Sequence, residues 1–156
     1  MAIPSISAAP IERVRSILLT QNGTLLLIKR VKPGSNTPYW VAPGGGVEPH
    51  DRTLRAALMR ELEEELGAQV EIVMHAFTLR HEKGGKNLRE YFYVCRLLRF
   101  DLKRRTGPEF NDPTRGDYLP DFIPLTESAL RSINMKTPEL TAWLIAHLPQ
   151  LRCLCR

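Results

Sequence analysis

The pattern of apolar and polar positions predicts strands in the first part of the chain. RVRSILLT (13–20) and TLLLIKR (24–30) are rich in aliphatic residues and lie on either side of an Asn-Gly pair at 22–23. Asn-Gly between two such runs is the strongest short signal for a β-hairpin, because both residues tolerate a positive φ. A loop rich in Pro, Gly, Ser and Asn follows at 31–38, and YWVAPGGG (39–46) predicts a short apolar strand that ends in three glycines.

The pattern becomes helical from about Thr53 to Leu66. At 100° per residue, one arc of this segment is apolar, which predicts the face that packs on the core. Gly67 follows directly and suits the left-handed conformation in which many helices end. The apolar arc consists of Leu58, Met59, Leu62 and Leu66.

Acidic residues gather beside that arc, in the segment RELEEELG (60–67). Glu61, Glu64 and Glu65 share one face of the projected helix, whereas Glu63 points elsewhere. Like charges at these spacings destabilise an exposed helix by roughly 0.2–0.5 kcal/mol per pair. Either this is an ordinary solvated face, or a cation lies between the carboxylates and compensates their repulsion.

The rest of the chain predicts two more strands, a loop, a short strand and a final helix. The runs at 69–80 and 88–100 are β-like and flank HEKGGKN, which predicts a hairpin tip. Residues 101–120 resemble a long loop, and 121–125 predicts one short strand. Thr137 as N-cap and Pro138 as first residue begin a helix whose apolar positions recur at i, i+3, i+4 and i+7.

These elements predict an α/β protein with a mixed sheet, one acidic helix in the middle and one helix at the end. A length of 156 residues suits one domain over residues 1–156, with residues 1–11 as a flexible arm. Hydrophobic residues at 43% and charged residues at 25% argue against disorder. No apolar run approaches the roughly 18 residues that span a membrane, and the N-terminus is a poor signal peptide.

The cysteines indicate the redox compartment of the protein, and the charge distribution indicates the kinds of partner it could bind. Three cysteines, an odd number without zinc-ligand spacing, predict free thiols in a reducing cytoplasm. The net charge is +5, and residues 80–105 hold nine Lys or Arg against three acids. Such a stretch attracts nucleic acid, an anionic surface or a phosphorylated small molecule. Within it Arg80, Lys83 and Lys86 surround a Gly-Gly tip, where they either steer an anionic substrate or are simply solvated.

The segment PGGGVEPHDRTLRAALMRELEEELG (43–67) resembles the signature of the Nudix hydrolases. In that family a Gly leads through a loop and a Glu to a helix carrying Arg-Glu-aliphatic-any-Glu-Glu-any-Gly. The resemblance implies an α/β/α sandwich around a mixed β-sheet. It also implies hydrolysis of a nucleoside diphosphate linked to another moiety: a nucleotide, a nucleotide sugar, ADP-ribose or a dinucleotide polyphosphate. The positions that match the helix of the signature are Arg60, Glu61, Leu62, Glu64, Glu65 and Gly67.

The resemblance also implies roles for individual residues. Glu61, Glu64 and Glu65 would be ligands of Mg²⁺, or of Mn²⁺ in its place, and Arg60 would hold Glu61. The expected catalytic residues are therefore Glu64, Glu61, Arg60 and Glu109. In the family the general base is either a glutamate of the signature or an acid from a later loop; Glu109 is the leading candidate from the loop, with Asp112 and Asp117 behind it. The expected substrate-binding residues are Gly44, Gly45, Gly46, Arg80, Lys83 and Lys86.

The spacing before the helix departs from the family. Counting forward from Gly45 places the upstream Glu of the signature on Asp51, whereas counting back from Arg60 places it on Arg52. We expect a loop that is one residue longer. The alternatives to an enzyme are a nucleotide-sensing module on the same fold, and a protein that binds RNA or processes its ends. The expected partner is a phosphorylated small molecule rather than nucleic acid or membrane, and the chain is expected to be a monomer or homodimer.

Overall fold

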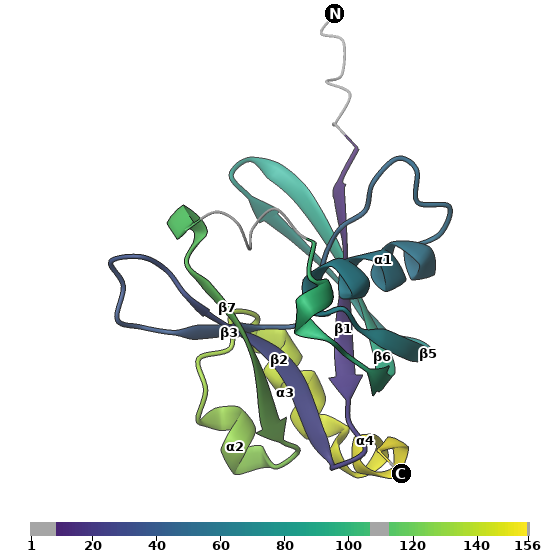
Figure 1. Ribbon diagram of the computed structural model, residues 1–156, viewed down its shortest axis with the longest axis vertical. Coiled ribbons are helices and arrows are strands. Elements are labelled where there is room, and N and C mark those ends of the chain that lie inside the picture. Colours follow the sequence, from purple (N-terminus) through teal and green to yellow (C-terminus); the bar gives the residue numbers. More distant parts are fainter. Residues whose placement is uncertain (1–8, 107–112, 156) are drawn as a thin grey trace, which may run out of the picture.

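The computed structural model describes residues 9–106 and 113–155. Within them seven strands form one sheet in the order β3-β2-β1-β6-β5, with β4 added to β1 and β7 added to β2 (Figure 1). The strands are β1 (Ile11–Leu19), β2 (Thr24–Val31), β3 (Tyr39–Val41), β4 (Gly44–Gly46), β5 (Gln69–Lys83), β6 (Lys86–Arg99) and β7 (Asp117–Pro124).

The sheet is mixed, as predicted, because one pair of its central strands is parallel. β1 and β6 run in parallel over the whole length of β1, and all other pairs are antiparallel. β1 pairs with β4 at residues 13–15 and with β2 at residues 18–19. One edge of β1 therefore pairs with β4 near its start and with β2 near its end. β4 has no second strand neighbour in the described part of the chain.

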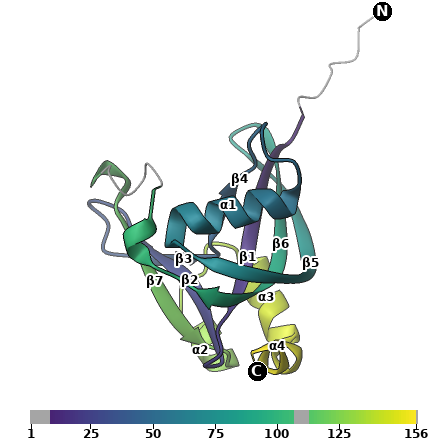
Figure 2. The ribbon, with the colours of Figure 1, turned by 45° about the vertical axis from the view of Figure 1, so that its right-hand side comes forward.

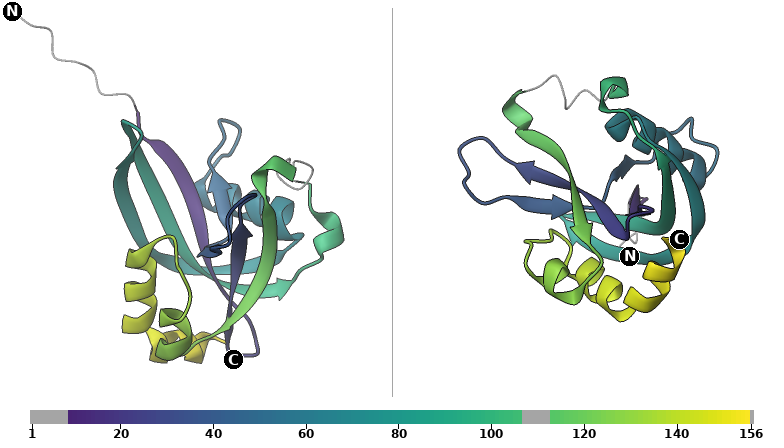
Figure 3. Two further views of the ribbon diagram at one scale, coloured as in Figure 1. Left: turned by 90° about the vertical axis from the view of Figure 1, so that its left-hand side faces the viewer. Right: turned by 60° about the horizontal axis from the view of Figure 1, so that its bottom comes forward.

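Helices cover both faces of the sheet, which confirms the predicted α/β/α arrangement. Figure 2 shows α1 across one side, and Figure 3 shows α3 and α4 on the other. The side chains of β1 alternate between two cores, since Val14 and Leu18 pack under α1 whereas Ile17 and Leu19 pack under α2 to α4. The helices are α1 (Leu54–Leu66), α2 (Glu127–Arg131), α3 (Pro138–Ala146) and α4 (Leu148–Leu154), with short 3₁₀ turns η1 (Leu102–Arg104) and η3 (Pro113–Arg115).

The ends of α1 follow from its sequence. The Thr53 side chain accepts a hydrogen bond from the backbone N–H of Ala56 at 3.0 Å, as an N-cap does. Gly67 is left-handed with φ 58°, and its N–H bonds to the carbonyl of Glu63. A side chain at position 67 would also collide with the backbone of Asp101. Both predicted ends of the acidic helix are confirmed.

Several predicted boundaries were wrong. β7 begins at Asp117, inside the predicted loop; it contains two prolines, which an edge strand tolerates because one side of it makes no ladder bonds. The final helix divides into α3 and α4 at His147, since Pro149 lacks the N–H that a continuous helix needs. α2 was not predicted, and Ile11, assigned to the arm, already pairs with Leu88.

The hairpins also differ in detail from the prediction. β5 and β6 extend to Lys83 and Lys86, so most of the predicted tip is strand and only Gly84 and Gly85 turn. The Asn-Gly hairpin is confirmed, but of its residues only Gly23 has a positive φ, at 76°. In the part of the chain that the structure describes, no helix is long and apolar enough to cross a membrane.

Candidate active site

The glycine strand β4 packs tightly between β1 and the acidic helix. A Cβ on Gly44 would collide with the backbone of Val14 and Arg15, and Gly44 has φ 152°. A Cβ on Gly45 would instead meet the carboxylate of Glu61, with Oε1 at 2.7 Å. The predicted close approach of backbone therefore holds at positions 44 and 45.

Arg60 is the centre of a hydrogen-bond network that joins the glycine strand to the helix. Its Nε and Nη2 donate to the two carboxylate oxygens of Asp51 at 3.0 and 2.9 Å. Nη2 also donates to the carbonyl of Gly46 at 3.0 Å. Nη1 donates to Glu61 Oε1 at 3.1 Å and to Glu64 Oε2 at 3.2 Å. The guanidinium thus orients two of the three acids that were expected to bind metal.

Asp51, rather than Arg52, takes the position of the upstream Glu of the signature, because it is the side chain that contacts Arg60. The Asp51 side chain is only 4% exposed, and both of its oxygens accept hydrogen bonds from Arg60. Arg52, in contrast, is exposed. The Asp51 side chain also accepts the backbone N–H of Glu48 at 2.8 Å. The hydrogen bonds from Arg60 lower the pKa of Asp51 from 3.8 to about 2, and the same bonds raise the pKa of Arg60. The extra residue therefore lies between Asp51 and Arg60.

The helical projection is confirmed for three of the four glutamates of α1, and Glu65 differs from it. Glu61 and Glu64 turn toward Arg60, with side chains 15% and 37% exposed. Glu63 points away from them and forms an ion pair with Arg104 at 2.7 Å. Glu65 is buried at 7% exposed, because its place on the helix adjoins the apolar arc.

The residue types on this face suit a hard divalent cation. Asp51, Glu61 and Glu64 carry three negative charges against the one positive charge of Arg60. Carboxylate oxygens are the ligands that Mg²⁺ prefers. In the conformations of the described residues, no three Asp, Glu, His or Cys side chains lie close enough together to hold an ion. Glu61 and Glu64 are instead turned to the Arg60 guanidinium.

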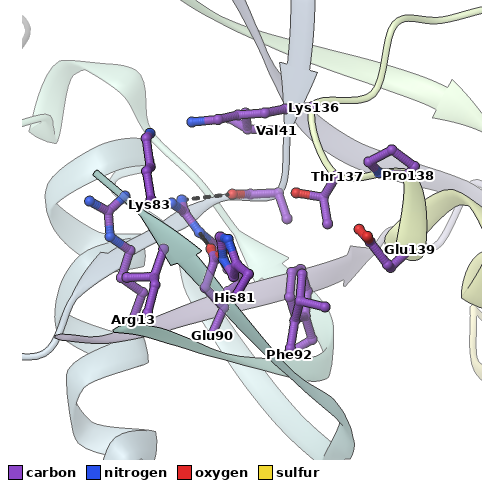
Figure 4. A pocket seen from close by; sticks show the side chains of 14 residues that line it. Arg13, Val41, His81, Lys83, Glu90, Phe92, Lys136, Thr137, Pro138 and Glu139 are labelled. Carbon is purple, nitrogen blue, oxygen red and sulfur yellow. Dashed lines mark hydrogen bonds and ion pairs between the residues drawn. The ribbon is translucent and has the colours of Figure 1, made fainter. Parts of the chain in front are cut away.

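A polar pocket of about 330 Å³ lies on the other face of β1, next to the glycine strand (Figure 4). Inside it Glu90 is 7% exposed and lies 3.0 Å from Arg15 Nε and 2.8 Å from His81 Nε2. Arg15 also donates to the carbonyl of Ala42 at 3.2 Å. Burial raises the pKa of Glu90, but the charge of Arg15 and the bonds from Arg15 and His81 lower it by more, so the pKa stays below its ordinary value.

The predicted basic residues of the hairpin separate between two faces. Lys83 lines the pocket, together with His81 and Leu79 from alternate positions of β5. Arg80 belongs to the opposite face of the strand and lines a separate depression with Arg89. Lys86 is exposed and is not part of the pocket lining.

The later basic residues and the candidate general bases lie elsewhere. Arg104 pairs with Glu63, and Arg105 donates to the carbonyls of Glu65 and Tyr118 at 2.9 Å each. These contacts hold the end of η1 against α1 and β7, so Arg104 and Arg105 are less available to RNA. Glu109 and Asp112 lie outside the described residues. Asp117 is exposed at the start of β7, where it pairs with Val31.

Sequence reasoning missed most of the pocket. Arg13, Arg15, Glu90 and Lys136 line it from three parts of the chain. The one local signal was RVRS, where Arg13 and Arg15 alternate with Val14 and so must share a strand face. Which other residues that face would meet depends on the parallel pairing of β1 with β6.

Comparison with known proteins gives a family match and similar folds. A family model described as NUDIX domain matches residues 10–144. A CTP pyrophosphohydrolase of Escherichia coli (strain K12) is 33% identical over 73 residues, which are 47% of this chain and 53% of that protein. The matched stretch thus spans about half the length of this curated relative.

Solved structures resemble the fold over nearly the whole chain. A NUDIX hydrolase from Nitrosomonas europaea superposes with a TM-score of 0.64 at 17% identity, covering 94% of this chain and 90% of the other. A MutT protein from Methanosarcina mazei Go1 gives a TM-score of 0.66 at 18% identity, covering 94% and 97%. At these identities the likeness establishes the fold.

Proposed function

The chain belongs to the NUDIX domain family, and from this premise we propose that it is a Mg²⁺-dependent pyrophosphohydrolase that cleaves a nucleoside diphosphate linked to another moiety. One observation carries the proposal. The carboxylates of Glu61 and Glu64 are held together by Arg60 on the helix face where Glu61 rests against Gly45. Such a fixed group of acids beside a bare backbone strand suits a metal-bound pyrophosphate.

In this proposal Glu61, Glu64 and Glu65 hold the metal. Bound Mg²⁺ would neutralise charge on the pyrophosphate oxygens and lower the pKa of the attacking water. Arg60 positions Glu61 and Glu64, and Asp51 keeps Arg60 in place through both of its oxygens. Arg60 bonds to one oxygen of Glu61 and one oxygen of Glu64, and a carboxylate has a second oxygen that could bind metal.

The water that attacks phosphorus must lose a proton to a nearby base. Glu64 is the candidate among the described residues, because it is the most exposed of the three acids on this face; it would take the proton with an oxygen that does not bind the metal. Glu109 remains the second candidate. Thr106, three residues before it, donates its backbone N–H to the carbonyl of Glu64 at 3.0 Å.

The pocket on the other side of the glycine strand would hold the part of the substrate beyond the pyrophosphate. β4 is three residues long, has no side chains and ends at the exposed Gly46; it lies beside the acids through Glu61 and pairs with Arg13 and Arg15, which line the pocket. A substrate that reaches both sites would pass along this edge.

The test is hydrolysis of a substrate panel with Mg²⁺ and with chelator, following release of a nucleoside monophosphate. The panel contains nucleoside triphosphates, ADP-ribose, nucleotide sugars and diadenosine polyphosphates, with CTP included because the curated relative is named for it. Glu64→Gln is compared with Glu63→Gln, which makes the same chemical change on the same helix but outside the acidic face.

We expect metal-dependent turnover of one class of substrate, reduced by at least about 100-fold in Glu64→Gln, since each 1.36 kcal/mol of barrier is about tenfold. Glu63→Gln should stay within about threefold of the wild type, because it alters only an ion pair at the protein surface. Equal activity of the two variants would exclude the role given to Glu64. Binding of a nucleotide without turnover would instead support the sensing module.

A further inference from the structure

Three positive side chains from separate parts of the chain converge on one side of the pocket. Arg13 comes from β1, Lys83 from the end of β5, and Lys136 from the segment before α3. Figure 4 shows these three side chains on the same side of the pocket, while Glu139 lies on the opposite side.

The structure gives this cluster no acidic partner. Glu90, the buried acid of the pocket, is already bonded to Arg15 and His81. Among the described residues, no hydrogen bond or ion pair involves the side chains of Arg13, Lys83 or Lys136. The Lys136 ammonium lies 6.0 Å from the centroid of the Tyr39 ring.

Lys136, although exposed, is the member of the cluster that the other cations affect most clearly. Burial lowers its pKa, and repulsion from Lys83, Arg15 and Arg13 lowers it further, while Glu90 opposes the shift weakly. Like charges held together in this way make the charged form of each one less favourable. An anion placed among them would relieve the repulsion and gain charge-assisted hydrogen bonds.

The cluster lies directly beside the proposed path of the substrate. Arg13 is the cross-strand partner of Gly46, and the carbonyl of Gly46 accepts a hydrogen bond from Arg60. The cations and the acidic face therefore lie on the two sides of the same glycine strand. Lys136 is fixed independently of its side chain, because its backbone N–H donates to the carbonyl of Trp40 at 2.9 Å.

We propose that Arg13, Lys83 and Lys136 form a subsite for a phosphate group of the substrate other than the two joined by the broken bond. The preferred substrate would then carry at least three phosphates, which disfavours ADP-ribose and simple nucleotide sugars. The third phosphate comes either from a longer phosphoanhydride chain or from a phosphomonoester on the ribose. This inference rests on the proposed function for its kinetic test but not for its binding test.

The binding test uses inorganic pyrophosphate with chelator present, measured by calorimetry at low salt. Lys83→Gln and Lys136→Gln should each weaken binding by about tenfold, which corresponds to about 1.4 kcal/mol. The matched control is Lys103→Gln, which removes the same charge from an exposed position that does not line the pocket; it should stay within about twofold. Absence of binding to the wild type, or equal weakening by all three variants, would overturn the subsite.

The kinetic test compares substrates that differ by one phosphate. For CTP against CDP, and for 2′-phospho-ADP-ribose against ADP-ribose, Lys83→Gln and Lys136→Gln should raise KM about tenfold for the more phosphorylated member only. An effect with CTP identifies the phosphoanhydride chain, and an effect with the 2′-phosphate identifies the monoester. Equal changes for both members of each pair overturn the subsite. If no substrate is hydrolysed, but Lys83→Gln and Lys136→Gln weaken pyrophosphate binding and Lys103→Gln does not, the proposed function is wrong and the anion site is supported.

Discussion

The carboxylate of Glu61 lies against Gly45, in the space that the Cβ of any other residue at position 45 would occupy. Gly45 belongs to β4 and Glu61 to α1, so this contact sets how close the acidic helix comes to the sheet. Gly46, the next residue, has nothing within 4 Å of its Cβ position. Two neighbouring glycines of one motif are therefore under different constraints, and substitutions can separate them.

Gly45→Ala should reduce catalysis while leaving the fold intact. The added methyl group would displace the Glu61 carboxylate from Arg60 and from the expected metal position. We expect kcat to fall by about 10- to 100-fold, equivalent to about 1.4–2.7 kcal/mol of barrier. Steady-state kinetics at saturating Mg²⁺ measures the effect, and a thermal melt checks the fold.

The control for this change is Gly46→Ala. Neither Gly45 nor Gly46 has a positive φ, so alanine is compatible with the backbone at both positions. Gly46→Ala should retain activity within about twofold, since its methyl group points into open space. If both variants lose activity equally, the contact between Gly45 and Glu61 is not what requires glycine here.

The acidic helix could be predicted from sequence because its determinants are local. The cap at Thr53, the end at Gly67 and the shared face of Glu61 and Glu64 all follow from residues within one or two helical turns. The projection was wrong at the margins of its apolar arc. Met59 is 41% exposed, whereas the three leucines of the arc are fully buried.

The pocket could not be predicted, because its residues meet only through long-range pairing. Arg15 and Glu90 are 75 positions apart in the chain and become neighbours because β1 and β6 pair in parallel. Local pattern specifies that both segments are strands but not which strands pair, or in which direction. Local pattern also could not decide between Asp51 and Arg52, because that choice depends on which side chain reaches Arg60 in the folded protein.

The centre and the margin of the apolar arc should differ sharply in their contribution to stability. Leu62 is fully buried under the sheet, and Leu62→Ala should reduce the free energy of unfolding by about 2–5 kcal/mol through lost burial and a residual cavity. Met59→Ala, on the same helix but 41% exposed, should cost less than about 1 kcal/mol. Urea denaturation followed by circular dichroism compares the two; similar midpoints would mean that α1 packs through another face.

One of the three thiols should react much faster than the others. Cys153 is exposed, whereas Cys95 and Cys155 are buried. Burial raises the pKa of Cys95 to about 11 and also raises that of Cys155, so little thiolate forms at either. Ellman's reagent at mildly alkaline pH should therefore titrate one thiol per folded chain and three after denaturation. Cys153→Ser should remove the fast phase, and persistence of that phase would place the reactive thiol elsewhere.

The pair of Asp51 and Arg60 should make stability depend on pH in a narrow acidic range. The pKa of Asp51 falls from 3.8 to about 2 on folding because of its hydrogen bonds with Arg60. A carboxyl whose folded pKa is depressed stabilises the folded state above the unfolded pKa, and this contribution is lost as the pH falls through the folded value. Near neutral pH, Asp51→Asn should lower the free energy of unfolding by about 1.5–3 kcal/mol, the usual contribution of hydrogen bonds to charged groups.

The difference in unfolding free energy between the wild type and Asp51→Asn should be constant above pH of about 4 and shrink between about 4 and 2. Guanidinium denaturation at several pH values measures both proteins side by side. Glu48→Gln is the matched control, because the Glu48 carboxylate is half-exposed and 3.7 Å from Arg60, and such pairs contribute at most about 1 kcal/mol. A difference for Asp51→Asn that stays the same down to pH of about 2 would mean that its charge does not stabilise the fold, and Arg60 would then be positioned by Gly46, Glu61 and Glu64 alone.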